Sequence, residues 1–206
     1  MKNPIGPYPG RQIFLGKTIK GAPCFAYLIT GRSPESRQRK ATKVDNAIRI
    51  GPLGNQAYDP LRHYNAVKFD SSSGVLCVSN GIQTDACYEI YKLLFATDAN
   101  PGKEYLQTTL EGAGAEPDSY HTPRIAGVIT FNNKQTAGFI GIKSYGARAK
   151  SWQINLEPGK LTGISTYTGT LDSPQATNPD FALPVVDFTA KTAAELSKFI
   201  FDISGL

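Results

Sequence analysis

Polar side chains suited to anion binding and proton transfer occur in two strand-like segments near the middle of the sequence. Tyr64 and Lys68 belong to the first segment, and Asn80-Gly81, a pair that tolerates positive φ, ends the second. Positions 64, 66 and 68 of a regular strand point to one face, so a phenol and an ammonium are predicted to lie side by side. The phenol and the ammonium together could stabilise an oxyanion. The alternative is a strand whose polar face is simply exposed to solvent.

Arginines form a second group of candidates. Residues 31–43, GRSPESRQRKATK, contain five basic residues against the single Glu35. The guanidinium forks of Arg32 and Arg37 match the oxygens of a phosphate monoester. The alternative for such a basic run is a solvated loop.

A third group lies in the glycine-rich polar stretch 111–124, EGAGAEPDSYHTPR. A loop of this length inside a compact domain is often functional. Pro123 restricts the backbone at the entry to the next strand, so Arg124 is expected to be held rigidly beside the site, or else to be a surface arginine.

The elements that must position these groups are mostly strands, according to the β-branched and aromatic runs and the turn residues between them. Strands are predicted over 12–18, 23–30, 44–50, 64–69, 75–79, 125–131, 136–142, 147–154, 161–167 and 185–188, and helices over 82–97, 104–110 and 192–203, the last with a Thr192–Glu195 capping box. Turns are expected at 71–74 and 132–134, and an irregular connection over 168–184. The short connections predict an antiparallel meander and an α+β fold.

Length and composition favour one domain over residues 1–206, with 40% hydrophobic and 19% charged residues. No apolar run approaches a membrane span and no export signal is evident, so a cytoplasmic location and no membrane partner are expected. Three cysteines without C-x-x-C spacing and two histidines predict no metal site. The net charge of +5 allows nucleic acid or a phosphorylated small molecule, but the basic run lacks the interleaved aromatics that favour nucleic acid.

Four stretches in this order resemble the archaeal-type IMP cyclohydrolase family: TGRSPESR (30–37), HYNAVKF (63–69), VSNGIQTD (78–85) and EPDSYHTPRIAGVI (116–129). The resemblance implies a four-layer αββα sandwich of antiparallel sheets, like that of the N-terminal nucleophile hydrolases but without their nucleophile. It also implies a homo-oligomer, either dimer or tetramer, and no cofactor.

The reaction implied by this resemblance is ring closure of 5-formamidoimidazole-4-carboxamide ribonucleotide to IMP with loss of water, so the partner is a small-molecule purine ribonucleotide. Such a step needs orientation, a donor for the oxyanion and proton transfer. Tyr64 and Lys68 are expected to stabilise the formyl oxygen, and Glu116, or a water that it positions, to take the carboxamide proton. The substrate-binding residues implied are Arg32, Arg37, Asn65, Asn80, Gly81, Thr84, Asp85, Thr122 and Arg124.

The sequence departs from the family pattern in its ten-residue N-terminal lead, in an enlarged loop around Glu116, and in ending soon after the last helix. The enlarged loop bears directly on the assignment of Glu116 as the base. The alternative function is a purine-nucleotide-binding relative with lost or altered amide-hydrolase activity, which would be stabilised by IMP without turning over substrate.

Overall fold

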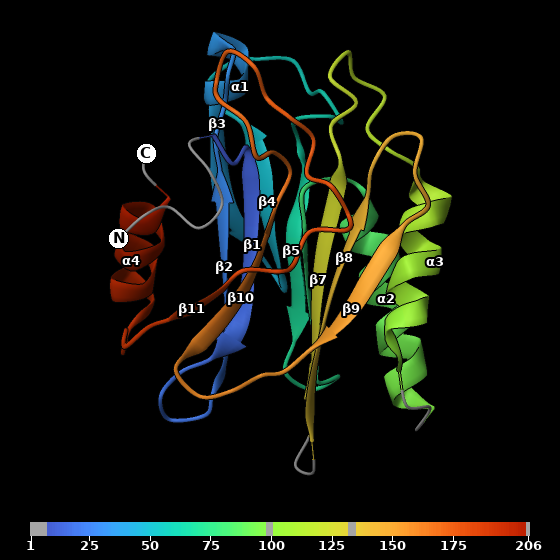
Figure 1. The fold of residues 1–206 in the computed structure, drawn as a ribbon, viewed down its shortest axis with the longest axis vertical. Coiled ribbons are helices and arrows are strands. Elements are labelled where there is room, and N and C mark those ends of the chain that lie inside the picture. Colours follow the sequence, from blue (N-terminus) through green and yellow to red (C-terminus); the bar gives the residue numbers. More distant parts are fainter. Residues whose placement is uncertain (1–7, 98–100, 132–134, 205–206) are drawn as a thin grey trace.

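The computed structural model describes residues 8–97, 101–131 and 135–204. Two antiparallel sheets stack face to face, and helices cover both outer faces (Figure 1). The α+β class with antiparallel sheets is therefore confirmed. No helix within the described ranges is long and apolar enough to cross a membrane.

The strands are β1 (Arg11–Lys17), β2 (Pro23–Ile29), β3 (Arg39–Val44), β4 (Ala47–Pro52), β5 (Tyr64–Asp70), β6 (Val75–Ser79), β7 (Arg124–Phe131), β8 (Thr136–Lys143), β9 (Lys150–Ile154), β10 (Lys160–Ser165) and β11 (Val185–Asp187). The helices are α1 (Pro34–Arg37), α2 (Gln83–Ala96), α3 (Lys103–Ala113) and α4 (Ala193–Ile203).

The larger sheet has seven strands in chain order, from β3 to β9, so each strand in it pairs with the next. The predicted meander is confirmed from β7 to β9 but is wrong for the strand predicted over 161–167, because β10 pairs with β1 and not with β9. The smaller sheet has the order β11-β10-β1-β2, which means that the chain returns after β9 to pair β10 with β1. The turn predicted at 132–134 lies outside the described residues.

The basic run forms an edge strand, which corrects the solvated-loop interpretation for residues 39–43. These residues belong to β3, the edge strand of the larger sheet, which pairs with β4 and with no other strand of residues 8–97, 101–131 and 135–204. Charged side chains have low strand propensity, but an edge strand that is mostly exposed to solvent can accommodate them. Lysines on such an edge also discourage pairing with strands of other chains.

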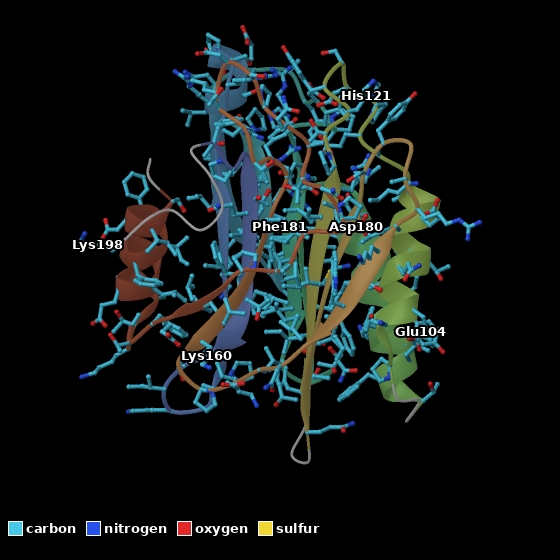
Figure 2. All side chains as sticks on the ribbon, in the orientation of Figure 1. Glu104, His121, Lys160, Asp180, Phe181 and Lys198 are labelled. Atoms are coloured by element: carbon cyan, nitrogen blue, oxygen red, sulfur yellow. The ribbon has the colours of Figure 1, made fainter. Side chains whose placement is uncertain are left out.

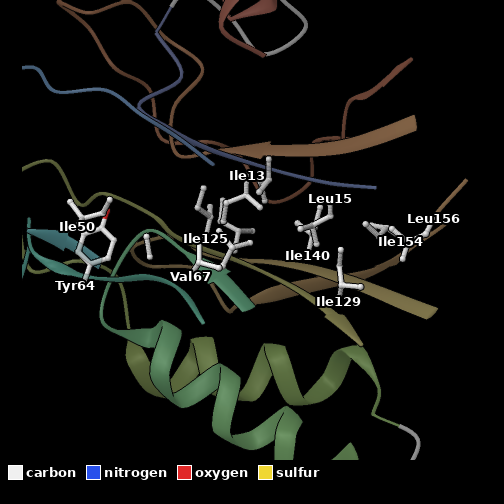
Figure 3. Packing of buried hydrophobic residues seen from close by; sticks show 14 residues of the cluster. Ile13, Leu15, Ile50, Tyr64, Val67, Ile125, Ile129, Ile140, Ile154 and Leu156 are labelled. Carbon is white, nitrogen blue, oxygen red and sulfur yellow. The ribbon is translucent and has the colours of Figure 1, made fainter. Parts of the chain in front are cut away.

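Apolar side chains hold the layers together. Between the sheets, Ile13 and Leu15 of β1 pack with Ile125, Ile129 and Ile140 of the larger sheet (Figure 3). A second cluster joins α2 and α3 to the outer face of the larger sheet, and a third joins α4 to the outer face of the smaller one. Because β1 is covered on both faces, every residue from Arg11 to Gly16 is buried.

The last helix begins as predicted. Thr192 Oγ1 accepts a hydrogen bond from the Glu195 backbone N–H at 3.2 Å. The Glu195 carboxylate accepts from the Lys191 N–H at 2.8 Å, one residue earlier than in a regular capping box. Leu196, Ile200 and Ile203 face the core.

Strand β5 contains one extra residue relative to β4. Ile48 is paired with Val67, whereas Arg49 is paired with Asn65, so Ala66 has no partner on β4. An extra residue in one strand reverses the alternation of side chains beyond it. This bulge decides which polar side chains of β5 can act together.

Candidate functional site

A cavity of about 550 Å³ opens at one end of the sandwich, where the start of β1, the loop after β2 and the loop before β7 meet. His121, labelled in Figure 2, belongs to the last of these loops and marks that end of the molecule. The volume suits a small-molecule ligand. Four arginines and three acidic residues line it: Arg11, Arg32, Arg39, Arg62, Asp59, Glu116 and Asp118.

A buried ion pair lies in the cavity wall. Glu116 Oε2 accepts a hydrogen bond from Arg11 Nη2 at 2.9 Å, and only 4% of Glu116 and 9% of Arg11 are exposed. Burial raises the pKa of Glu116, and the charges of Arg11 and Arg124 only partly offset this effect. A carboxylate with a raised pKa is suited to accept a proton near neutral pH.

Asn80 fixes the other oxygen of this carboxylate. Its Nδ2 donates to Glu116 Oε1 at 3.3 Å and to the Pro123 carbonyl at 2.9 Å. Its Oδ1 accepts from Gln83 Nε2 at 2.9 Å and from the Ile125 N–H at 2.8 Å. The buried amide thereby has partners for both donors and both acceptor positions.

Arg124 lies behind Glu116 and is held by α2. Its Nη1 donates to Gln83 Oε1 at 2.9 Å, and its Nε is buried with no hydrogen-bond partner in the part of the chain that the structure describes. Burial lowers the pKa of Arg124. A Cβ at Gly81 would come within 2.6 Å of Arg124 Nη1. Gly81 is not among the positive-φ glycines, so close approach of Arg124, rather than a left-handed turn, explains the glycine.

Tyr64 points between the sheets. Its hydroxyl is hydrogen-bonded to the Tyr27 hydroxyl at 2.8 Å, and burial raises the pKa of Tyr27. Burial lowers the pKa of Arg11, but Glu116 and then the two phenols outweigh that effect, so the guanidinium stays protonated. The phenol pair is therefore near enough to influence the charge of Arg11, although neither tyrosine is among the residues that line this cavity.

Lys68 points to the opposite face of the larger sheet. Its Nζ lies 2.8 Å from Glu89 Oε1, 3.4 Å from Asp85 Oδ1 and 4.6 Å from the centroid of the Tyr88 ring, all on α2. Asn65 Nδ2 also donates to Asp85 Oδ1, at 3.0 Å. The prediction that Tyr64 and Lys68 share one face is wrong, because the bulge breaks the two-residue period between them.

The predicted residues therefore fall into two groups. Arg32, Glu116 and Thr122 line the cavity, with Asn80, Gly81 and Arg124 directly behind Glu116. Asn65, Lys68 and Asp85 form a separate cluster under α2. A smaller cavity of about 220 Å³ lies there, and Tyr64, Asn65 and Asp85 are among its lining residues.

Two predicted residues have mainly local contacts. Arg37 Nε donates to the Gly31 carbonyl at 2.9 Å, so this guanidinium ties its own loop and does not line the cavity. Thr84 is fully buried and its hydroxyl donates to the Gly81 carbonyl at 3.1 Å.

Several lining residues were not identified from the sequence. Arg11 opens an apolar strand, Asp59 and Arg62 occupy an irregular segment, and Tyr120 sits in the loop before β7. Arg39 belongs to the basic run 31–43, but no feature of that run distinguished Arg39 from the other basic residues as a cavity residue. Tyr120 falls within the motif 116–129, but that motif did not single it out. For Arg11, Asp59 and Arg62 no local signal exists, because these residues converge with the others only in the folded chain.

The fold and the cavity define a two-sheet α+β protein with an arginine-lined cavity built around a buried carboxylate. Within the described part of the chain, no group of three His, Cys, Asp or Glu side chains is arranged to hold a metal ion. The chemistry available here is anion binding, proton transfer to Glu116 and stabilisation of negative charge by arginine and tyrosine.

Comparison with known proteins agrees with this description. The family model described as "IMP cyclohydrolase-like protein" matches residues 8–205, and the chain belongs to this family. A protein named IMP cyclohydrolase from Methanococcus maripaludis (strain C5) is 32% identical over 197 residues, which cover 95% of this chain and 88% of that protein. The protein of the same name from Methanocaldococcus jannaschii is 30% identical over 196 residues, covering 94% and 85%. The resemblance predicted from the four motifs is confirmed.

Proposed function

We propose that this protein is an IMP cyclohydrolase, which closes 5-formamidoimidazole-4-carboxamide ribonucleotide to IMP and releases water in purine biosynthesis. The observation that carries this proposal is the buried Glu116–Arg11 pair in the wall of an arginine-lined cavity, within a chain of this family. A purine-nucleotide-binding relative without this activity is not favoured.

Arg32 is the proposed phosphate anchor. Arg39 already donates to the Ser36 and Thr30 carbonyls, and Arg62 to Asp59. The Arg32 guanidinium donates no hydrogen bond within the described ranges, so its fork is available to the substrate. Thr122 lines the same cavity and is a further proposed substrate contact.

Glu116 is the proposed base. It takes a proton from the carboxamide nitrogen, which attacks the formyl carbon and makes the formyl oxygen an oxyanion. That oxygen leaves as water with one hydrogen from the carboxamide and one from the formamido nitrogen, so the reaction balances without an added reactant. Burial and the raised pKa of Glu116 support this role.

Arg11 is the proposed stabiliser of the oxyanion, and Tyr64 is proposed to act through Arg11, because Tyr64 is not among the residues that line this cavity. Arg11 is protonated in the cavity wall, and the Tyr64–Tyr27 pair is near enough to influence its charge. Lys68 is not part of this proposal, because it faces α2. Asn80, Gly81 and Arg124 are assigned to holding Glu116, which leaves Arg37, Asn65, Thr84 and Asp85 without a proposed contact to the reacting atoms.

The layer order of helix, sheet, sheet and helices in Figure 1 supports an N-terminal nucleophile hydrolase-like sandwich. We also infer that the protein is a cytoplasmic homo-oligomer, either dimer or tetramer. Sedimentation equilibrium tests the assembly, and a purely monomeric species would contradict it.

The function is tested by following IMP formation in the ultraviolet with wild type, Glu116→Gln and Glu104→Gln. Loss of a general base should lower kcat/KM by about 10² to 10⁴ in Glu116→Gln. Glu104, labelled on α3 in Figure 2, is exposed and far from the cavity, so Glu104→Gln should match wild type. If the wild type shows no turnover but IMP still raises its Tm, the proposed reaction is refuted, whereas the proposal that the cavity binds a purine nucleotide stands.

A further inference from the structure

Two side chains from opposite sheets meet across the cavity. The Arg32 guanidinium carbon lies 3.5 Å from the centroid of the Tyr120 ring. Arg32 belongs to the loop after β2 of the smaller sheet, and Tyr120 to the loop before β7 of the larger one. Tyr120 is 55% exposed, so burial of apolar surface does not account for its position.

The loop that carries Tyr120 is braced by its own hydrogen bonds. The Asp118 carboxylate accepts from the Thr122 N–H at 2.8 Å and from the Thr122 hydroxyl. The Glu116 N–H donates to the Thr122 carbonyl, and the His121 N–H to the Asp118 carbonyl, both at 3.1 Å. These contacts close residues 116–122 on themselves and hold Tyr120 near the tip.

The neighbouring histidine adds a second brace. His121 has φ of +50°, a conformation uncommon outside glycine, and its ring stacks on Tyr145 with centroids 3.8 Å apart. The strained backbone is held in place by this stacking and by the closed loop. Tyr120 therefore presents its ring from a fixed support.

The loop that carries Arg32 is fastened in a similar way. Arg37 Nε donates to the Gly31 carbonyl at 2.9 Å and Arg37 Nη2 to the Arg32 carbonyl at 3.4 Å. A Cβ at Gly31 would lie 2.7 Å from the Ser36 backbone, so this tight path requires glycine. With the backbone of Arg32 fixed, only its long side chain is left to be oriented.

Stacking orients that side chain without using its donors. A separation of 3.5 Å is possible only when the guanidinium lies roughly parallel to the ring. The cation is then attracted to the ring face, while its N–H groups lie in the plane and stay free for an anion. Because the side chain is ordered before binding, less conformational entropy is lost when a phosphate binds.

We propose that Tyr120 is a positioning residue that holds the Arg32 guanidinium ready for the phosphate of the substrate. This inference rests on the proposed function, in which Arg32 binds that phosphate. A different role for Tyr120, stacking directly on the heterocycle, predicts a different pattern of affinities.

The test measures by calorimetry the Kd of IMP and of ribose 5-phosphate, which carries a phosphate but no heterocycle. Tyr120→Leu should weaken both ligands by the same factor, about threefold to tenfold, with kcat nearly unchanged. Tyr120→Phe keeps the ring face and should bind as wild type does. In an Arg32→Ala background, Tyr120→Leu should have no further effect, and Tyr105→Leu on α3 is the matched control.

Each other outcome is decisive. If Tyr120→Leu weakens only IMP, and also does so in Arg32→Ala, the ring stacks on the heterocycle and the positioning role is wrong. If neither Kd changes, the positioning role is wrong while the proposed function stands. If wild type binds neither ligand, both the inference and the proposed function fail.

Discussion

Replacing Arg11 by methionine should reveal how strongly the buried site depends on charge pairing. The Arg11–Glu116 contact is 2.9 Å long and both side chains are almost fully buried. Methionine fills a similar space without charge. In Arg11→Met the carboxylate would keep the Asn80 hydrogen bond but lose its closest positive charge.

Breaking a buried pair by removing one partner costs about 3–5 kcal/mol of unfolding free energy. Arg124 still lowers the pKa of Glu116 and so compensates part of its charge. We therefore expect a loss of about 3 kcal/mol at neutral pH, the lower end of that range. Removing both charges in Arg11→Met with Glu116→Met should cost less than the sum of the single changes, because no unpaired charge remains.

The loss should depend on pH. Burial raises the folded-state pKa of Glu116 above its usual 4.5, and Arg11 lowers it, so Arg11→Met raises it further. A group whose folded pKa is raised favours folding below its unfolded pKa, and this contribution is lost as pH rises through the folded value. Arg11→Met should therefore be destabilised more, relative to wild type, at pH 8 than near pH 4.5.

Urea unfolding followed by circular dichroism at both pH values measures these differences. Lys160→Met removes an exposed partner of Glu157, so that control should change stability little at either pH. If the loss of unfolding free energy in Arg11→Met is the same at both pH values, and the double variant loses the sum of the two single losses, charge pairing is not the cause of the loss.

Three further predictions concern other parts of the chain. Lys68→Met should keep kcat/KM within about twofold, whereas Tyr64→Phe should lower kcat/KM by about tenfold or more. If the ultraviolet assay shows the larger loss in Lys68→Met, Lys68 acts in catalysis and the proposed assignment is wrong. Gly81→Ala should lower the free energy of unfolding by about 1–3 kcal/mol, because the new methyl group meets Arg124, and an unchanged urea midpoint would contradict that clash. Thr192→Ala should cost about 1 kcal/mol by removing the α4 cap without altering kcat, and an altered kcat would argue against a purely local role.

Local patterns in the sequence were enough to predict much of the fold. The hairpin of β5 and β6 with its turn at 71–74, the meander from β7 to β9 and the cap of α4 all depend on neighbouring residues, whose propensities and spacing are visible in one dimension. The four motifs also predicted the family, and among their residues Arg32, Glu116 and Thr122 do line the cavity.

Tertiary structure decided which of those residues can act together. Arg11 and Glu116 are 105 positions apart, and no periodicity links them before the sheets stack. The bulge at Ala66 turned Lys68 away from Tyr64, because strand alternation predicts a shared face only while the register is unbroken. Local sequence patterns were therefore enough for most of the elements, the family and several residues of the cavity, whereas packing of the two sheets set the charge pairing and the face on which each side chain lies.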